Sequence, residues 1–290
     1  MRENEDPACH PSEVGLRLEA TRPVVWKGDS ELPHLNFPSP QSGLVLVVDL
    51  WSGLGSLTLA LVSLGVQCIV LSVEQDKDLR IAQAKVLADA VHLSNVEDVE
   101  ADMLQKVLTK RNFSAIVLGG GAPCQGNSSL NKARKGLADA RSLQPRYLQQ
   151  LATAVRAMTA TPVFTLLENV ASSPTDVVAE YSHLMGSIPL LISAALWGYI
   201  ERRRYFWLTG PAGGLNTKDK YKLPSGFSVA AQEGIMALQA HKAKAWPQDL
   251  RLEYGFHLTF HPDEVLKHPQ EGHVPVHPGV QAPHRLVQQS

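Results

Sequence analysis

The sequence predicts an α/β fold with a doubly wound, mostly parallel sheet of the Rossmann-like type. Short apolar runs recur along the chain, segments with helical spacing lie between them, and several runs end at glycines or at an acidic residue. The runs are rich in β-branched residues and do not alternate with polar ones, which is typical of parallel strands buried on both faces. These predicted strands are residues 44–48, 68–73, 114–118, 162–167 and 188–193.

Composition narrows the class of protein. The chain has 290 residues, of which 44% are hydrophobic and 19% charged, so it can bury a sizeable core. Its formal net charge of -1 excludes a globally basic nucleic-acid binder, and any anion-binding face must be local. Three widely spaced cysteines without a C-x-x-C pair argue against a disulfide scaffold or a zinc site. The start of the chain has no apolar signal core, and no apolar run approaches the ~20 residues of a membrane span, so we expect an intracellular, soluble protein.

A glycine-rich turn follows the first predicted strand and precedes a predicted helix. Gly53 and Gly55 permit a tight turn whose backbone approaches a ligand, beside the free N–H groups of the helix start. Glu74 ends the next strand about 20 residues on, where a carboxylate can accept both hydroxyls of a ribose. Asp102 ends a third element and is placed to take an adenine amino group. A nucleotide-type cofactor site is the prediction; a plain turn and a solvated surface Glu74 are the alternatives.

The segment GGGAPCQG follows the predicted strand at residues 114–118. Its glycines let the backbone come close to a ligand at the carboxyl edge of the sheet, where open α/β sheets bind ligands. Pro123 fixes the backbone before Cys124, which places the thiol at the mouth of the crevice, as a nucleophile requires. The alternative is a buried structural thiol.

Charged residues gather in three places after Cys124. Residues 127–137 contain Lys132 and Arg134 and predict a mobile loop that closes over a polyanion, or simply a solvated loop. Glu168 ends the strand at residues 162–167, where a carboxylate is costly unless it is exposed in a cleft or paired. Arg202 and Arg204 are expected to share one face of a further strand.

Five segments, taken in order, resemble the motifs of the DNA cytosine-5 methyltransferases over about residues 44–208. They are DLWSGLG, the Glu74 strand end, GGGAPCQG, LLENV and ERRRYFW. The segments NKARKGL and RYFW are most similar to the eukaryotic de novo and plant domains-rearranged branches, although the motif order is not permuted as in the plant branch. Trp51 stands where the family usually has Phe, and Glu201 where it usually has Gln or His.

The resemblance implies the fold of an S-adenosylmethionine-dependent methyltransferase, with double-stranded DNA as partner and S-adenosylhomocysteine as product. Cys124 would attack C6 of a flipped-out cytosine, and Glu168 would hydrogen-bond its N3. Arg202 and Arg204 would contact the base carbonyl, a phosphate or the catalytic carboxylate. The residues implied to bind the cofactor are Asp49, Trp51, Ser52, Gly53, Gly55, Glu74, Asp102 and Pro123. Those implied to bind the substrate are Gln125, Asn127, Ser128, Lys132, Arg134 and Asn169.

The domain organisation expected from the sequence is an N-terminal arm at 1–43, a catalytic domain at 44–210, a small, irregular target-recognition region at 211–267 and a flexible tail at 268–290. Residues 229–244 are compatible with a helix, and His257, His261 and His268 do not form a metal site. The family's final Gly-Asn motif is absent, which keeps open a catalytically weak or silent regulatory relative that binds DNA, a partner methyltransferase or a chromatin factor. A transfer-RNA cytosine methyltransferase is a further alternative, although its late Cys-Phe-Thr motif is missing. A nuclear location is expected if the source is eukaryotic.

Overall fold

The computed structural model describes residues 6–24, 43–196, 201–216, 218, 227–232, 234–240, 249–251 and 257–259. The chain divides into two compact units. The first comprises residues 1–192, 203–222 and 229–238, and the second comprises residues 193–202, 223–228 and 239–290. The predicted tail at 268–290 lies outside the described residues.

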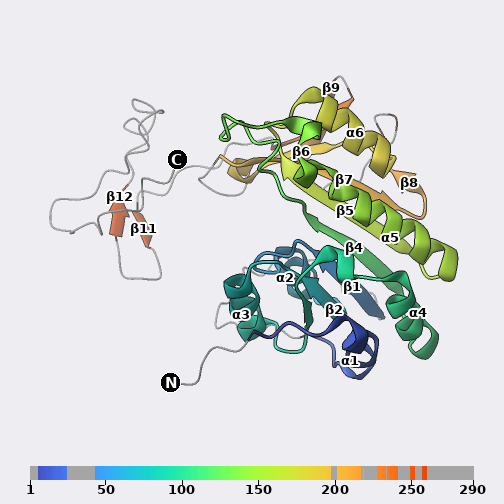
Figure 1. The fold of residues 1–290 in the computed structure, drawn as a ribbon. Coiled ribbons are helices and arrows are strands. Elements are labelled where there is room, and N and C mark those ends of the chain that lie inside the picture. Colours follow the sequence, from blue (N-terminus) through green and yellow to red (C-terminus); the bar gives the residue numbers. More distant parts are fainter. Residues whose placement is uncertain are drawn as a thin grey trace. The chain divides into compact units, whose positions relative to one another are not determined.

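The central sheet has the strand order β3-β2-β1-β4-β5-β7-β6-β10-β9, and β8 pairs with β7. Neighbouring strands are parallel from β3 through β5, whereas β7 runs antiparallel to β5 (Figure 1). This arrangement confirms the predicted mostly parallel α/β sheet. The strands are β1 (Leu44–Leu50), β2 (Gln67–Val73), β3 (Val91–Leu93), β4 (Ala115–Gly121), β5 (Val163–Val170), β6 (Leu190–Ser193), β7 (Arg203–Gly210), β8 (Gly213–Gly214), β9 (Phe227–Gln232) and β10 (Ile235–Ala240).

Helices cover both faces of the sheet. They are α1 (Val14–Ala20), α2 (Ser56–Ser63), α3 (Lys77–Val86), α4 (Ala101–Lys110), α5 (Pro145–Met158) and α6 (Thr175–Met185). Leu46 and Val48 of β1 belong to one buried cluster, with side chains of α1, α4, α5 and α6. Val45 and Val47 belong to another, with side chains of α2 and the end of α3. Because successive strand residues point to opposite faces, a continuous apolar strand builds both clusters.

Local sequence explains where several helices begin and end. The carboxylate of Asp76 caps α3 by accepting hydrogen bonds from the backbone N–H groups of Asp78 and Leu79, at 2.9 and 3.1 Å. Pro145 occupies the first turn of α5, where its missing N–H costs nothing. Gly186 ends α6 in the left-handed conformation, with φ 58°.

The N-terminal segment contributes to the core of the first unit. Val14 and Leu18 of α1 are fully buried. The backbone N–H of Cys9 donates to the carbonyl of His92 on β3 at 2.7 Å, and that of Val24 donates to the carbonyl of Cys68 on β2 at 2.7 Å. Residues 6–24 of the predicted N-terminal arm therefore pack on the edge of the sheet that β2 and β3 form.

Two secondary-structure predictions are wrong. The third element does not end at Asp102: the strand is β3 at Val91–Leu93, and Asp102 lies in the first turn of α4. Within the stretch predicted as a possible helix, the described residues 229–232 and 234–240 do not form one, because β9 and β10 occupy them and Gly234, with φ 76°, directly precedes β10. Alanines favour a helix locally, but pairing of β10 with β6 overrides that preference.

In the second unit, β11 (Asp249–Arg251) and β12 (His257–Thr259) form an antiparallel pair. Across the described residues, no helix is long and apolar enough to cross a membrane. The same part of the chain holds no group of three or more His, Cys, Asp or Glu side chains arranged to bind a metal ion.

Candidate active site

Four predicted site segments meet at the carboxyl edge of the parallel sheet. The register pairs Asp49 of β1 with Gly119 of β4, and Gly121 of β4 with Glu168 of β5. Strand β2 ends beside β1, so that Glu74 follows directly at the same edge. This is where open α/β sheets bind ligands.

The turn after β1 has an unusual backbone. Among the described residues, Trp51 is the non-glycine residue with a positive φ, 50°. Gly53 has φ 56°, and a Cβ atom built there would meet nothing within 4 Å, so the turn is open on that side. The Ser52 hydroxyl lies 2.8 Å from that of Ser72, which ties the turn to β2. A left-handed Trp51 is a strained conformation of the kind that clusters at functional sites.

Glu74 is held by backbone donors. Its carboxylate accepts from the N–H of Gly53 at 2.8 Å through one oxygen and from the N–H of Asp76 at 2.9 Å through the other. The carboxylate is partly buried and keeps further acceptor positions, because two oxygens offer about four lone-pair sites. The glycine turn and the acid at the end of the second strand are therefore in direct contact.

A cavity of about 530 Å³ opens beside these residues. Trp51, Glu74, Pro123 and Gln125 line it, and the predicted Asp102 does not. The cavity also contacts residues that sequence analysis missed, which are Val73, Gln75, Ser94, Asn95, Val96, Glu97, Gly121 and Gln144. Asp102 is exposed on α4. Its assignment followed from the misplaced third strand, and the corresponding strand end carries Ser94 to Glu97 instead.

Gln144 stands out among the missed residues. The indole Nε1 of Trp51 donates to the Gln144 side-chain oxygen at 2.7 Å, across 93 residues of sequence. Gln144 precedes α5, and nothing in its local sequence marks it. Only the fold brings it to the cavity.

Asp49 is a structural residue rather than a cavity-lining one. It is 1% exposed, and its carboxylate accepts from the N–H and the hydroxyl of Thr58, at 3.2 and 2.8 Å. Burial raises the pKa of Asp49 to about 7, partly offset by the Thr58 hydrogen bonds. Gly55 caps α2 with φ 82°, and a Cβ there would lie 2.8 Å from Gln83. Both residues fix α2 against the sheet, and their predicted cofactor contacts stay predictions.

Cys124 is the half-buried cysteine of the chain, whereas Cys9 and Cys68 are buried. Burial raises the pKa of the Cys68 thiol to about 12, so Cys68 is a poor source of thiolate. The Cys124 carbonyl accepts from the N–H groups of Asn127 and Ser128, at 2.9 and 2.8 Å, which fixes the turn that presents the thiol.

Glu168 and Arg204 form an ion pair at the end of β5. The Arg204 Nε lies 2.7 Å from a Glu168 carboxylate oxygen, and the two side chains are 23% and 24% exposed. A Cβ on Gly121 would lie 2.8 Å from the other Glu168 oxygen, so glycine there makes room for the carboxylate. Val170 pairs with Arg204 across the antiparallel β5–β7 ladder, which explains why a distant arginine reaches this acid.

Two predicted substrate contacts are buried supports in this structure. Asn127 is fully buried and donates to the Tyr181 hydroxyl at 3.0 Å, while the Ser142 hydroxyl donates to its oxygen at 2.7 Å. Asn169 is also fully buried and donates to the Ala122 carbonyl at 3.2 Å. Both amides satisfy buried polar groups near Cys124, and their predicted substrate contacts stay predictions.

The basic loop after Cys124 is anchored. One nitrogen of Arg134 donates to the carbonyls of Asn127 and Ser172, at 3.1 and 2.8 Å, and joins this loop to the loop after β5. Lys132 is exposed. Ser128 and Arg204 line a separate cavity of about 380 Å³, together with Ser129, Leu130, Val170, Ala171, Ser172 and Arg203. Arg202 belongs to the second unit, and its predicted role stays a prediction.

Comparison with known proteins gives a match over part of the chain. Residues 45–173 match the family model described as C-5 cytosine-specific DNA methylase. The match covers less than half of the 290 residues, and over these residues it supports the resemblance read from the motifs. The similarity to the eukaryotic branches stays a prediction. A comparison with curated proteins gives no significant match.

Solved structures that resemble the chain include three methyltransferases. A protein assigned as a DNA modification methyltransferase encoded within an E. coli prophage is 23% identical, with a TM-score of 0.44 over 57% of this chain and 46% of its own. Entamoeba histolytica EhMeth is 17% identical, with a TM-score of 0.46 over 62% and 56%. S. pombe Dnmt2 is 14% identical, with a TM-score of 0.41 over 61% and 52%. The chain thus spans about half the length of these proteins.

Proposed function

We propose that the protein is a DNA (cytosine-5)-methyltransferase that uses S-adenosylmethionine and forms a covalent bond between Cys124 and C6 of a flipped-out cytosine. One observation carries the proposal. The thiol-bearing turn after β4 and the paired Glu168 on β5 are neighbours across a register that matches Gly121 with Glu168. The family match covers Cys124 and Glu168.

The residues around the 530 Å³ cavity suit S-adenosylmethionine. The Glu74 carboxylate suits the ribose hydroxyls, and the Trp51 indole offers an aromatic surface for adenine. Polar groups from Ser94 to Glu97 can meet the adenine edge, which replaces the role predicted for Asp102. When bound, the cofactor supplies an electrophilic methyl group. Pro123 lines the same cavity, one residue before Cys124, so the two ligands would meet at this turn.

The chemistry that this chain supplies is addition and elimination. The Cys124 thiolate donates an electron pair to C6 of cytosine and forms a C–S bond, which makes C5 nucleophilic. Protonated Glu168 hydrogen-bonds N3 and offsets the negative charge that gathers on the ring. Arg204 pairs with the Glu168 carboxyl and keeps it in place. After C5 is methylated, loss of the C5 proton to a base and departure of the thiolate restore the aromatic ring.

A cytosine inside a duplex cannot reach this site, so the base must leave the stack; methyltransferases are among the standard examples of base flipping. We assign contacts with the DNA backbone to Lys132 and Gln125, which are exposed on the Cys124 loop. Ser128 lines the same cavity as Arg204. Arg202 is the further candidate for a phosphate or base contact.

The test is transfer of labelled methyl from S-adenosylmethionine to unmethylated duplex DNA. We expect label in DNA from the wild type and from Cys68→Ala, which removes a buried thiol, and none from Cys124→Ala. Cys124→Ala should still bind the cofactor. Label in a transfer-RNA substrate instead of DNA would support a transfer-RNA methyltransferase. DNA binding without label in either substrate would support a silent relative that acts on a partner methyltransferase or chromatin factor.

A further inference from the structure

Arg80 on α3 is an almost completely buried arginine, 4% exposed, directly behind the proposed cofactor cavity. One of its terminal nitrogens donates to the carbonyls of Glu74 and Gln75, at 2.5 and 2.8 Å. Both of these residues line the cavity. The guanidinium therefore fixes the backbone that carries the Glu74 carboxylate.

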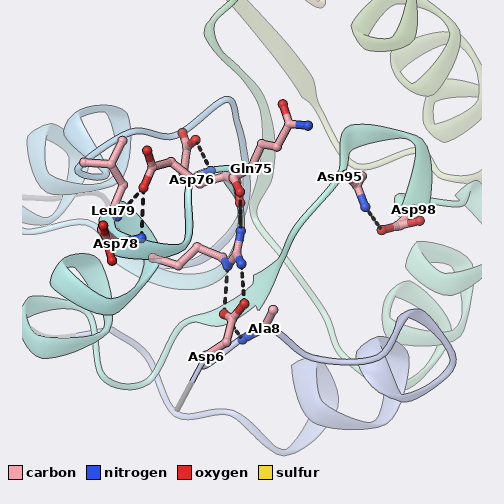
Figure 2. A network of polar contacts seen from close by, with 10 residues as sticks. Asp6, Ala8, Gln75, Asp76, Asp78, Leu79, Asn95 and Asp98 are labelled. Atoms are coloured by element: carbon pink, nitrogen blue, oxygen red, sulfur yellow. Dashed lines mark hydrogen bonds and ion pairs between the residues drawn. The ribbon is translucent and has the colours of Figure 1, made fainter. Parts of the chain in front are cut away.

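The opposite edge of the same guanidinium is held by the N-terminal segment. Arg80 Nε donates to one Asp6 carboxylate oxygen at 3.0 Å, and a terminal nitrogen pairs with the other oxygen. Figure 2 shows Asp6 at one end of this network and Gln75 at the other. The Arg80 hydrogen bonds lower the pKa of Asp6, which keeps the carboxylate charged at neutral pH. A two-pronged pair of this kind orients both groups as well as neutralising the charge.

Asp6 belongs to a segment that is itself fixed to the fold. Its carboxylate also accepts from the N–H of Ala8 at 3.0 Å, and the next residue, Cys9, bonds to β3. Val14 and Leu18 then bury α1 in the core. Asp6 is thus delivered to Arg80 by folded structure, although 74 residues of sequence separate the two.

We propose that Asp6 is a positioning residue for the cofactor: it orients Arg80, which in turn holds the Glu74–Gln75 backbone in its ligand-ready shape. This inference rests on the proposed function. Residues 6–24 lie outside the segment that matches the family model, residues 45–173, so the segment adds a support that the matched motifs do not include. Without the Asp6 charge, the buried Arg80 cation keeps only neutral partners and the turn loses rigidity. The cofactor must then order the turn when it binds, which lowers affinity.

The test compares Asp6→Asn with Glu19→Gln. Glu19 is the matched control because it joins the same segment to Lys110 of α4 through an exposed pair at 2.9 Å and does not line the cavity. Binding of S-adenosylmethionine and S-adenosylhomocysteine is measured by calorimetry on the full chain, well below the unfolding temperature. We expect Asp6→Asn to raise both dissociation constants about tenfold or more, a loss of roughly 1.4 kcal/mol. Glu19→Gln should leave them unchanged.

Two further readouts separate positioning from general destabilisation. In methyl transfer, Asp6→Asn should raise KM for S-adenosylmethionine and leave kcat at saturation unchanged. Asp6→Asn added to Arg80→Lys should cause less additional loss than it causes alone, because Asp6 acts through Arg80. If the wild type binds the cofactor and Asp6→Asn binds it with the same dissociation constant, the role of Asp6 is overturned and the proposed function is not. Failure of the wild type to bind either ligand overturns the proposed function and this inference with it.

Discussion

The site has two sides that are held together by different kinds of contact. The cofactor side consists of residues 49–55, 74–76 and 94–97, and the nucleophile side consists of residues 119–144 and 168–173 with Arg204. On the cofactor side, backbone groups make the decisive bonds: Glu74 accepts from Gly53 and Asp76, and Arg80 donates to two carbonyls. On the nucleophile side, buried side chains bond to one another. Asn127, Tyr181 and Ser142 form a closed network there.

This difference shows which features of a site a short sequence motif can predict. Backbone geometry depends on local residues such as Gly53, so a short motif reports it well. A side-chain network depends on partners far along the chain: Asn127 and Tyr181 are 54 residues apart. Substitutions on the cofactor side should therefore change ligand affinity, whereas substitutions on the nucleophile side should change stability and transfer rate.

The largest effect is expected from Glu168→Gln on the nucleophile side. The amide cannot deliver a proton toward N3, and it weakens the ion pair with Arg204. We expect kcat for DNA methylation to fall about 10²–10⁴-fold, the range that is typical when general acid assistance is lost. The dissociation constant for S-adenosylmethionine should not change. Glu180→Gln is the control, because Glu180 pairs with Arg146 at 3.0 Å on α6 and α5 and does not line a described cavity. A Glu168→Gln enzyme with wild-type kcat would remove Glu168 from the chemistry.

Acid sensitivity should distinguish the two sides next. Burial lowers the pKa of His92 on β3 to about 4, and the charges of Arg17 and Arg80 add to this, while Asp6 opposes it. Below pH ~6.5, His92 becomes protonated in the unfolded chain but stays neutral in the native protein. The His92 contribution to the free energy of unfolding therefore falls as pH drops toward about 4, by up to roughly 3 kcal/mol. The effect of Asp49 on stability has the opposite dependence on pH. Its pKa in the native protein is raised to about 7, so its contribution to the free energy of unfolding is lost as pH rises toward 7.

Because Asp49 acts in the opposite direction over the same pH range, the effect of His92 is the difference between two slopes: in His92→Gln, stability should fall less, or rise more, than in the wild type as pH drops from about 6.5 to about 4. The measurement is urea unfolding of wild type, His92→Gln and His183→Gln at a series of pH values from about 4 to 7. His183 is exposed on α6, on the nucleophile side, and its replacement should leave the slope as it is. Equal slopes in all three proteins would show that His92 does not make the cofactor side acid-sensitive.

Asn127→Leu tests the side-chain network directly. Leucine fills a similar volume but leaves the Tyr181 and Ser142 hydroxyls buried without their amide partner. Leaving such groups unsatisfied typically costs about 1–3 kcal/mol of unfolding free energy. Denaturant unfolding of the ligand-free protein measures this loss of unfolding free energy. Asn95→Ala is the control, because Asn95 is exposed and donates to the Asp98 carboxylate at 3.0 Å. A loss no larger than that of Asn95→Ala would place the support of the Cys124 turn elsewhere.

The same contrast explains how far sequence analysis reached. Apolar strands predicted the mostly parallel sheet, and the residues that follow them predicted that Gly53, Glu74, Cys124 and Glu168 lie at strand ends. These features follow from period and strand polarity, which are local. The β9–β10 hairpin was missed because its pairing with β6 is long-range, and it defeated the local helical preference of its alanines.

Side-chain direction is what the sequence could not supply. Asn127 and Asn169 sit within the expected motifs but point into the protein, and the Arg134 guanidinium bonds to loop carbonyls. Conversely, Gln144 and Arg80 carry no motif, and only contacts across 93 residues for Gln144 and 74 for Arg80 bring them to the site.

The smallest expected effect is on the cofactor side, from Glu74→Gln. The glutamine side chain has one acceptor oxygen, so it can keep the hydrogen bond from Gly53 or that from Asp76 but not both, and it places an NH₂ group against the remaining N–H donor. It also loses the charge that suits ribose hydroxyls. We expect the dissociation constant for S-adenosylmethionine to rise about tenfold, which corresponds to a loss of roughly 1.4 kcal/mol of binding free energy, with kcat at saturation unchanged.

Asp78→Asn is the control, because Asp78 lies exposed on α3 and does not line the cavity. An unchanged constant for Glu74→Gln would remove Glu74 from the ribose role. A fall in kcat with unchanged affinity would go further, because the two sides would then not be separable and the turn after β2 would have to act on the nucleophile as well.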